Sequence, residues 1–393
     1  ADVKGKVLLM LVNEPPSEDK SFFNGKALTY YGRWTYKYEE AARLGAAGVI
    51  LIHKSDMASY GWDVVRNSWS GERASLRDDK NPQLKLAAWV QLDIAHKMLA
   101  DSGKDLDQLI QAAQQRGFKP VELPIKVQAH VVSQVRPFDA YNVVGEVPGS
   151  DAMLKDQAVI ISAHYDHLGI RPGMKSDNIY NGALDNATGT AMVMEMARAA
   201  SGAAQKPKRS IIFAAVTGEE QGLLGSEYLG QHLPIPPGNI SLNINFDSIP
   251  PLGIPKEVSA DGYDRTTFAP AFDKTAADFG MTIQSPAHPE SGGYYRSDHF
   301  SFAHVGIPAF SVNTGGRFEG HPEEWVKEQQ KKNSANYHEP SDEFQEDGDY
   351  RTEGVMARFG LALAWQAANL PNLVEWRPGD EFEAARKAEA GGK

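Results

Sequence analysis

Residues 210–222 read SIIFAAVTGEEQG, a short apolar run that leads into two adjacent glutamates between glycines. The run 210–216 predicts a buried strand, because it is rich in β-branched and aromatic residues and is followed by a glycine. Adjacent side chains at a strand end point to opposite sides, so Glu219 and Glu220 can serve different roles. One carboxylate can bind a metal ion while the other faces a water on that ion; a solvated surface pair is the alternative.

Strands and helices alternate through the rest of the second half. The further elements are predicted as strands at 141–147, 158–163, 242–246 and 307–312 and as helices at 188–200, 223–232, 269–279 and 351–368. This alternation predicts an α/β fold with a mostly parallel twisted sheet and helices on both of its faces. Ligands of such sheets bind at the carboxyl ends of the strands.

Three predicted strands deliver metal-ligand residues to this edge of the sheet. His164, Glu220 and Asp247 each follow a different strand. A single histidine is more often a structural residue than a metal ligand. The evidence for a metal site is therefore that all three residues are expected at the same edge of the sheet. Asp166 can accept the free imidazole N–H of His164 and fix its tautomer, as metal-binding histidines require. The neighbouring His167 is expected to be structural.

Two further residues complete the candidate ligand set. Asp185 lies in the loop 182–189, where either it or Asn186 can cap the following helix, and His338 lies in an irregular stretch before the last helix. Two imidazoles and three carboxylates without a thiol are a ligand set for two divalent ions that share a carboxylate. Zinc is the expected metal, and manganese or cobalt would also fit. Without metal, the carboxylates would repel one another.

The first half of the chain predicts a smaller α/β domain, residues 1–124. Strands are predicted at 7–12, 48–53 and 84–92 and helices at 36–44, 94–100 and 106–115. This segment does not gather ionisable groups in the manner of an active site. We expect residues 125–372 to form the larger domain, which carries the site, and residues 373–393 to form a polar surface tail.

Composition narrows the classes of partner. The 393 residues carry a net charge of −11 and no long basic run, which argues against nucleic acid or an anionic membrane as the main partner. The chain has no cysteine, which excludes disulfides and thiolate metal sites. Its apolar stretches are too short to span a bilayer, and no signal peptide opens the chain. The oligomeric state stays open.

Taken together, the motifs resemble those of the bacterial di-zinc aminopeptidases, a family related to glutamate carboxypeptidase, the transferrin receptor and the glutaminyl cyclases. The resemblance covers roughly residues 141–369. Its segments are HYD at 164–166, LDN at 184–186, GEEQG at 218–222, Asp247, RSDH at 296–299, GIPA at 306–309 and YHEPSD at 337–342. It implies a zinc-exopeptidase-like fold, and the first half resembles the protease-associated (PA) domain that many members carry as an insert.

The resemblance also implies how the five ligands divide between two zinc ions. In the pattern of this family, Asp185 bridges the ions. His164 and Asp247 complete one ion, and Glu220 and His338 complete the other.

Three further residues receive catalytic roles by the same resemblance, and Asp166 is grouped with them as the expected partner of His164. Glu219 corresponds to the general base, which acts on a water that bridges the ions. Tyr337 and Arg296 match residues that help to stabilise the tetrahedral intermediate, and Asp166 stands beside the first histidine.

The resemblance therefore implies a metal-dependent aminopeptidase that removes N-terminal residues from peptides. It also implies a periplasmic or secreted protein whose signal peptide and first catalytic segment are not in this sequence, although the residues alone leave a cytoplasmic protein open. One rival is a carboxypeptidase or dipeptidase of the same superfamily. Two others are a single-zinc glutaminyl cyclase and a non-catalytic binding protein, and the complete ligand set disfavours both.

Overall fold

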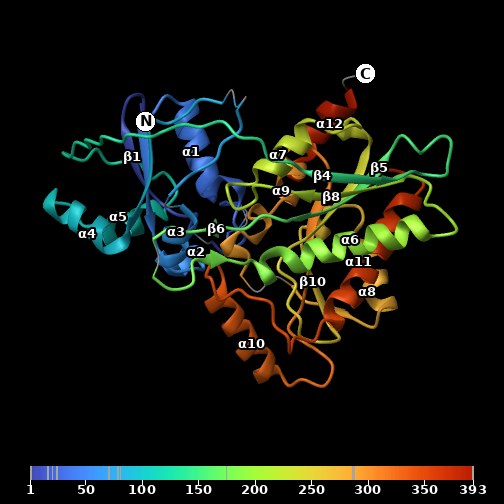
Figure 1. The fold of residues 1–393 in the computed structure, drawn as a ribbon. Coiled ribbons are helices and arrows are strands. Elements are labelled where there is room, and N and C mark those ends of the chain that lie inside the picture. Colours follow the sequence, from blue (N-terminus) through green and yellow to red (C-terminus); the bar gives the residue numbers. More distant parts are fainter. Residues whose placement is uncertain are drawn as a thin grey trace. The chain divides into compact units, whose positions relative to one another are not determined.

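The computed structural model describes residues 2–15, 17–19, 21–23, 25–69, 71–77, 79, 81–173, 175–285 and 288–391. The chain divides into two compact units (Figure 1). The larger comprises Asn67–Leu76, Asp139–Pro286 and Arg296–Lys393, and the smaller comprises Ala1–Arg66, Arg77–Phe138 and Ala287–Tyr295. The segment Asn67–Leu76 therefore belongs to the larger unit, although it comes from the first half of the chain. The domain boundaries at 124 and 372 stay a prediction.

The larger unit is built on a seven-stranded sheet with the order β11-β10-β12-β9-β5-β8-β4. In chain order, its strands are β4 (Val143–Val147), β5 (Ala158–His164), β8 (Ser210–Val216), β9 (Ile240–Phe246), β10 (Glu257–Asp261), β11 (Thr282–Ile283) and β12 (Ala309–Thr314). The central strands β8, β5, β9 and β12 run parallel, whereas β4 and β10 pair antiparallel with β8 and β12. The mostly parallel sheet predicted from the sequence is confirmed.

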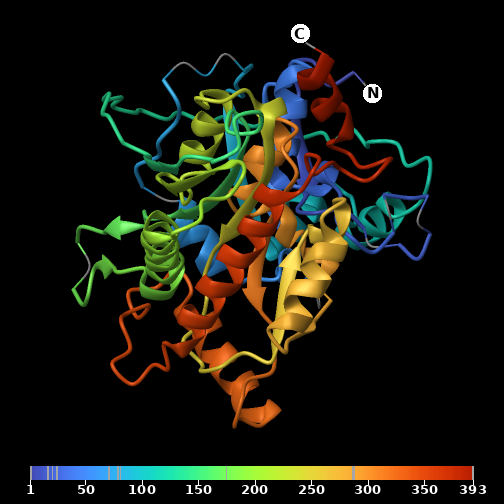
Figure 2. The same cartoon turned by 90° about the vertical axis from the view of Figure 1, so that its right-hand side faces the viewer.

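Helices cover both faces of this sheet (Figures 1 and 2). One face carries α6 (Thr188–Gly202), α8 (Ala269–Asp278) and α11 (Arg351–Asn369), and the other carries α7 (Leu224–Gln231) and α9 (His299–His304). The core lies between the sheet and the first group of helices, where alternate strand residues such as Ile161, Phe213 and Ile244 are buried in one cluster with Phe359. Alternation of this kind follows from the two-residue period of a strand.

Two parts of the larger unit differ from the expectation. The irregular stretch before His338 contains a polar helix, α10 (Glu323–Asn336). The expected surface tail instead packs against the unit, since Trp376 is buried and its indole N–H donates to the main-chain oxygen of Gly306. Helix α12 (Glu383–Gly391) is anchored by the buried Arg386, whose guanidinium donates to the oxygens of Pro237 and Ile240. The sequence did not predict these contacts, because the apolar residues of this segment are isolated within a polar stretch.

Helix α11 offers a test of the core. A methyl group added at Gly360 would lie 2.3 Å from Cζ of the fully buried Phe246, whereas one added at the exposed Gly354 would meet nothing within 4 Å. We expect Gly360→Ala to lower the free energy of unfolding by about 1–3 kcal/mol through overpacking. The control Gly354→Ala should be neutral or stabilise by up to about 1 kcal/mol. Denaturant midpoints measure both, and equal effects would contradict the packing described.

The smaller unit contains a parallel three-stranded sheet with the order β1-β2-β3. Its strands are β1 (Val7–Leu11), β2 (Gly48–His53) and β3 (Leu86–Gln91), and its helices include α1 (Trp34–Arg43), α4 (Leu92–Asp101) and α5 (Leu106–Ala113). Ile52, Ala95 and Leu99 form its core. No helix among the described residues of the chain is long and apolar enough to cross a membrane.

Candidate metal centre

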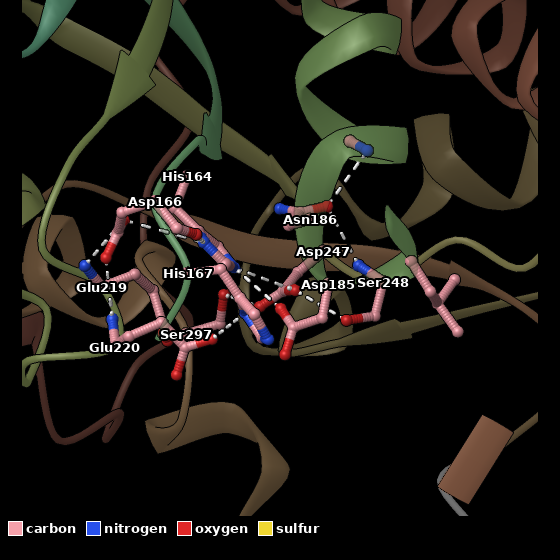
Figure 3. Close-up of polar contacts among 12 residues, drawn as sticks. His164, Asp166, His167, Asp185, Asn186, Glu219, Glu220, Asp247, Ser248 and Ser297 are labelled. Atoms are coloured by element: carbon pink, nitrogen blue, oxygen red, sulfur yellow. Dashed lines mark hydrogen bonds and ion pairs between the residues drawn. The ribbon is translucent and has the colours of Figure 1, made fainter. Parts of the chain in front are cut away.

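The neighbouring strands β8, β5 and β9 bring three ligand-type residues to one edge of the sheet (Figure 3). His164 is the last residue of β5, Asp247 directly follows β9, and Glu220 lies four positions after the end of β8. The strands are parallel, so their carboxyl ends coincide. His164 and Glu220 are buried.

The carboxylate of Asp185 lies between the two histidines. Its Oδ1 is 3.2 Å from His164 Nε2, and its Oδ2 is 3.4 Å from His338 Nε2. His164 Nε2 is also 3.3 Å from Asp247 Oδ1, and His338 Nε2 is 3.2 Å from Glu220 Oε2. The five residues therefore form two groups that share Asp185.

His167 joins the second of these groups, whereas the sequence had indicated a structural residue. Its Nδ1 lies 2.7 Å from Glu220 Oε1, and the pair can hold a metal ion together with Asp185. Neither ring nitrogen of His167 has a hydrogen-bond partner of suitable geometry among the described residues, and the same is true of Glu220 Oε1. In the sequence, this candidate ligand could have been found from the second histidine of the HYDH segment at 164–167.

These buried atoms test whether the residues fit a metal ion. Buried polar atoms without partners are rare and call for an explanation. Imidazole nitrogens that face carboxylate oxygens across 3.2–3.4 Å match the donor set that divalent zinc prefers. The donor set of both groups therefore fits a divalent ion.

The backbone around Asp185 is held tightly. Asp342 accepts hydrogen bonds from the main-chain N–H groups of Leu184 (2.9 Å) and Asp185 (3.0 Å). Gly182 has φ of +66°, and a side chain there would lie 2.5 Å from the oxygen of Asp185. Asn186 serves the following helix, since its Oδ1 accepts from the N–H of Gly189. Of the two adjacent residues, Asn186 makes the capping contact and Asp185 faces the histidines.

The carboxylate of Asp166 accepts hydrogen bonds from the glutamate loop, and the main-chain oxygen of Asp166 contacts His164. The two carboxylate oxygens accept from the main-chain N–H groups of Glu219 (3.1 Å) and Glu220 (3.3 Å). The ring Nδ1 of His164 instead lies 3.1 Å from the main-chain oxygen of Asp166, and 3.8 Å from its carboxylate. The sequence correctly predicted that His164 and Asp166 contact each other. It predicted the wrong atom of Asp166, because the carboxylate turns toward the neighbouring loop and the main-chain oxygen faces the ring.

Burial raises the pKa of the Glu219 carboxyl well above its usual value, and the charges of Glu220 and Asp247 act in the same direction. Burial likewise opposes the ionised form of Asp185, but hydrogen bonds from His164 and His338 bring its pKa below the usual value. The pKa values of these two carboxyl groups are thus shifted in opposite directions, as is common at functional sites.

Tyr337 and Arg296 are placed differently with respect to the cluster. The ring of Tyr337 stacks on His338 at 3.9 Å between centroids. Although the residue is 42% exposed, burial of its hydroxyl and the charges of Asp185 and Glu220 raise its pKa. The charge of Arg296 acts on Asp261, which belongs to neither group.

Ser297, next to Arg296 in the chain, contacts one of the ligand-type residues. Its hydroxyl donates to Asp247 Oδ2 at 2.6 Å (Figure 3). The sequence had indicated this segment only through its resemblance to family members.

Comparison with known proteins gives one family match. The model of peptidase family M28 matches residues 142–364, which hold the six ligand-type residues of the two groups, His167 included.

Individual relatives match this chain over only part of their own length. A probable zinc metalloprotease of Pyrenophora teres f. teres is 36% identical over 139 residues, 35% of this chain and 28% of that protein. Leupeptin-inactivating enzyme 1 of Streptomyces exfoliatus is 31% identical over 181 residues, 46% of this chain and 36% of that protein. The probable leucine aminopeptidase 2 of Aspergillus oryzae is 26% identical over 353 residues, 87% of this chain and 58% of that protein. The chain thus spans less than two thirds of these relatives.

Proposed function

The chain belongs to peptidase family M28, and on this premise we propose that it is a zinc-dependent aminopeptidase that removes N-terminal residues from peptides. One observation carries the proposal: the two oxygens of Asp185 face two different groups of ligand-type residues. A carboxylate placed in this way can serve two ions at once. The names of the relatives support zinc as the metal and the amino-terminal polarity of cleavage.

Five residues would hold the two ions, and His167 would lie beside the second ion through its contact with Glu220. His164 and Asp247 would complete the first, His338 and Glu220 the second, and Asp185 would be common to both. When bound, such ions polarise the scissile carbonyl and lower the pKa of water toward about 7.

Glu219 acts as the general base of the proposed reaction. Its neighbour Glu220 is taken up by the second group, whereas no ion pair with a histidine is found for Glu219 among the described residues. The raised pKa favours a carboxylate that accepts a proton from water and returns it to the leaving amine. Asp166 positions this loop through the N–H groups of Glu219 and Glu220.

Tyr337 is the proposed hydrogen-bond donor to the tetrahedral intermediate. Its raised pKa keeps the hydroxyl protonated, and the carboxylates that raise the pKa are those of the cluster itself. Arg296 is proposed for the same task, although its charge acts on Asp261. The PA-like nature of residues 1–124 and a periplasmic or secreted location are proposals that rest on the family resemblance.

Glu219 is the carboxylate that could receive a free amino terminus of the substrate. It is not a proposed metal ligand, whereas the charges of Glu220 and Asp247 would be offset by the ions that they hold. The carboxypeptidase rival would instead need a cation to receive the substrate carboxylate.

Blocked substrates test this polarity. We expect a free leucyl amide or leucyl peptide to be cleaved and its N-acetylated analogue to be resistant, because acetylation removes the ammonium charge. A C-terminally amidated peptide with a free amino terminus is the matched control and should remain a substrate. Rapid cleavage of the acetylated compound, together with resistance of the amidated one, would favour the carboxypeptidase rival. Product release is followed by mass spectrometry.

A further inference from the structure

A segment from the first half of the chain reaches the loops that carry the second group of ligands. Asn67 and Ser68 at the end of α3 (Trp62–Trp69), together with Arg73 and Ala74, belong to the larger unit. We call these four residues the strap. Its contacts are with the loops of His338 and Glu220.

The strap holds the His338 loop through Asn67. The side-chain amide of Asn67 donates to the main-chain oxygen of His338 at 3.3 Å and to Glu339 Oε1 at 2.8 Å. Asn67 is itself buried and fixed by Arg171, whose guanidinium donates to Asn67 Oδ1 at 2.9 Å. His338 has φ of +58°, a conformation that residues other than glycine seldom adopt. The loop therefore depends on contacts of this kind.

The strap also holds the glutamate loop. Arg73 donates to the main-chain oxygen of Gln221 at 3.0 Å, and the N–H of Ala74 donates to Gln221 Oε1 at 3.2 Å. Gln221 directly follows Glu220. Both loops that supply the second group are thus tied to one segment.

The decisive contact is between Ser68 and the ring of His338. Ser68 Oγ lies 2.7 Å from Nδ1, and both residues are buried. The other nitrogen, Nε2, faces Asp185 and Glu220. A ligating Nε2 must offer its lone pair, so Nδ1 carries the proton and donates it to Ser68 Oγ.

His164 and His338 are therefore oriented by different means. His164 Nδ1 lies 3.1 Å from the main-chain oxygen of Asp166, only two residues away. Because the partner atom belongs to the main chain, this contact does not depend on the side chain of Asp166. His338 Nδ1 contacts a side chain 270 residues away. A substitution at position 68 therefore acts on one histidine and leaves the other in place.

We infer that Ser68 is a positioning residue that sets the affinity of the second metal ion, the one held by Glu220 and His338, without contacting the ion or the substrate. This inference rests on the proposed dinuclear site. Loss of a hydrogen bond to the second nitrogen of a ligating histidine typically lowers metal affinity by about 10–100-fold. The first half of the chain then contributes to the centre although it supplies none of the proposed ligands.

Stepwise zinc titration of the full chain tests the inference. The protein is stripped with a chelator, and the two binding steps are resolved by calorimetry in zinc-buffered solution. We expect Ser68→Ala to weaken one step by about 10–100-fold and to leave the other unchanged. Ser68→Thr retains the hydroxyl and should bind as the parent does.

Ser297→Ala is the reciprocal control. Ser297 is as buried as Ser68, each being 7% exposed, and its hydroxyl donates to Asp247 in the first group. We expect it to weaken the other step. Crystals of Ser68→Ala at limiting zinc should show anomalous density beside Asp247 and none beside Glu220. The metal-free unfolding midpoint shows whether each variant folds, and Ser68→Val against Ser68→Thr repeats the comparison if alanine is not tolerated.

Three results would overturn the inference. If the parent takes up two ions and Ser68→Ala binds both as tightly, Ser68 does not position His338, and the proposed dinuclear site stands. If Ser68→Thr weakens the step as much as Ser68→Ala, side-chain volume rather than the hydroxyl is responsible. A parent protein that binds a single ion would instead refute the dinuclear proposal and this inference with it.

Discussion

Glu219→Gln is expected to lower kcat by about 10²–10⁴-fold, the usual contribution of a general base, while both zinc ions remain bound. Glutamine keeps the shape of the side chain and removes its basicity. The proposed base takes a proton from water in the transition state, so kcat and kcat/KM should fall together with little change in KM. Steady-state kinetics on a leucyl substrate and metal analysis of the same preparation measure both quantities.

Glu220→Gln is the matched control, since it makes the same change one residue along the chain. A neutral amide is a poorer ligand for a dication than a carboxylate, and Glu220 lies beside both His167 and His338. We therefore expect this variant to lose metal. If Glu219→Gln loses metal and Glu220→Gln retains it, the roles of the two neighbours are reversed. Full kcat in Glu219→Gln would place the base elsewhere.

Asp185→Asn is expected to abolish most of the stabilisation that zinc gives to the folded protein. An ion at about 1,000 times its dissociation constant stabilises the folded state by about 4 kcal/mol per site, and Asp185 is the ligand proposed for both sites. Addition of zinc to the stripped parent should therefore raise the unfolding midpoint strongly, and the same addition should change the midpoint of Asp185→Asn little. Activity should fall with the metal content.

Asp278→Asn serves as the control for that variant. Asp278 is the last residue of α8, and its carboxylate forms an exposed pair with Lys274. The charge change is the same, but the residue lies outside both groups, so the shift caused by zinc should persist. An equal zinc shift in Asp185→Asn and the parent would contradict a shared ligand at that position.

The strands and ligand-type residues of the site could be predicted because each depends on local pattern. The run 210–216 is apolar and short, and it forms β8 with those same bounds. Once the strands were taken as parallel, their carboxyl ends had to coincide, and His164, Glu220 and Asp247 lie together as expected. Their roles as metal ligands remain a proposal.

The remaining contacts could not be predicted because they join distant loops. No local pattern separates Ser68 from other serines, since its significance comes from the fold that brings it to His338. The contacts of Asp342 with the main-chain N–H groups of Leu184 and Asp185 have the same origin. For Asp166, the sequence spacing fixed the neighbour but not which of its oxygens would face His164.

The most direct test of the dinuclear site is a crystal structure of the zinc-loaded protein with anomalous data on both sides of the zinc absorption edge. We expect two zinc peaks, one on each side of the Asp185 carboxylate. The first should be bound by His164 and Asp247, and the second by Glu220 and His338. A single peak at full zinc occupancy, or a peak that Asp185 does not contact, would contradict the account.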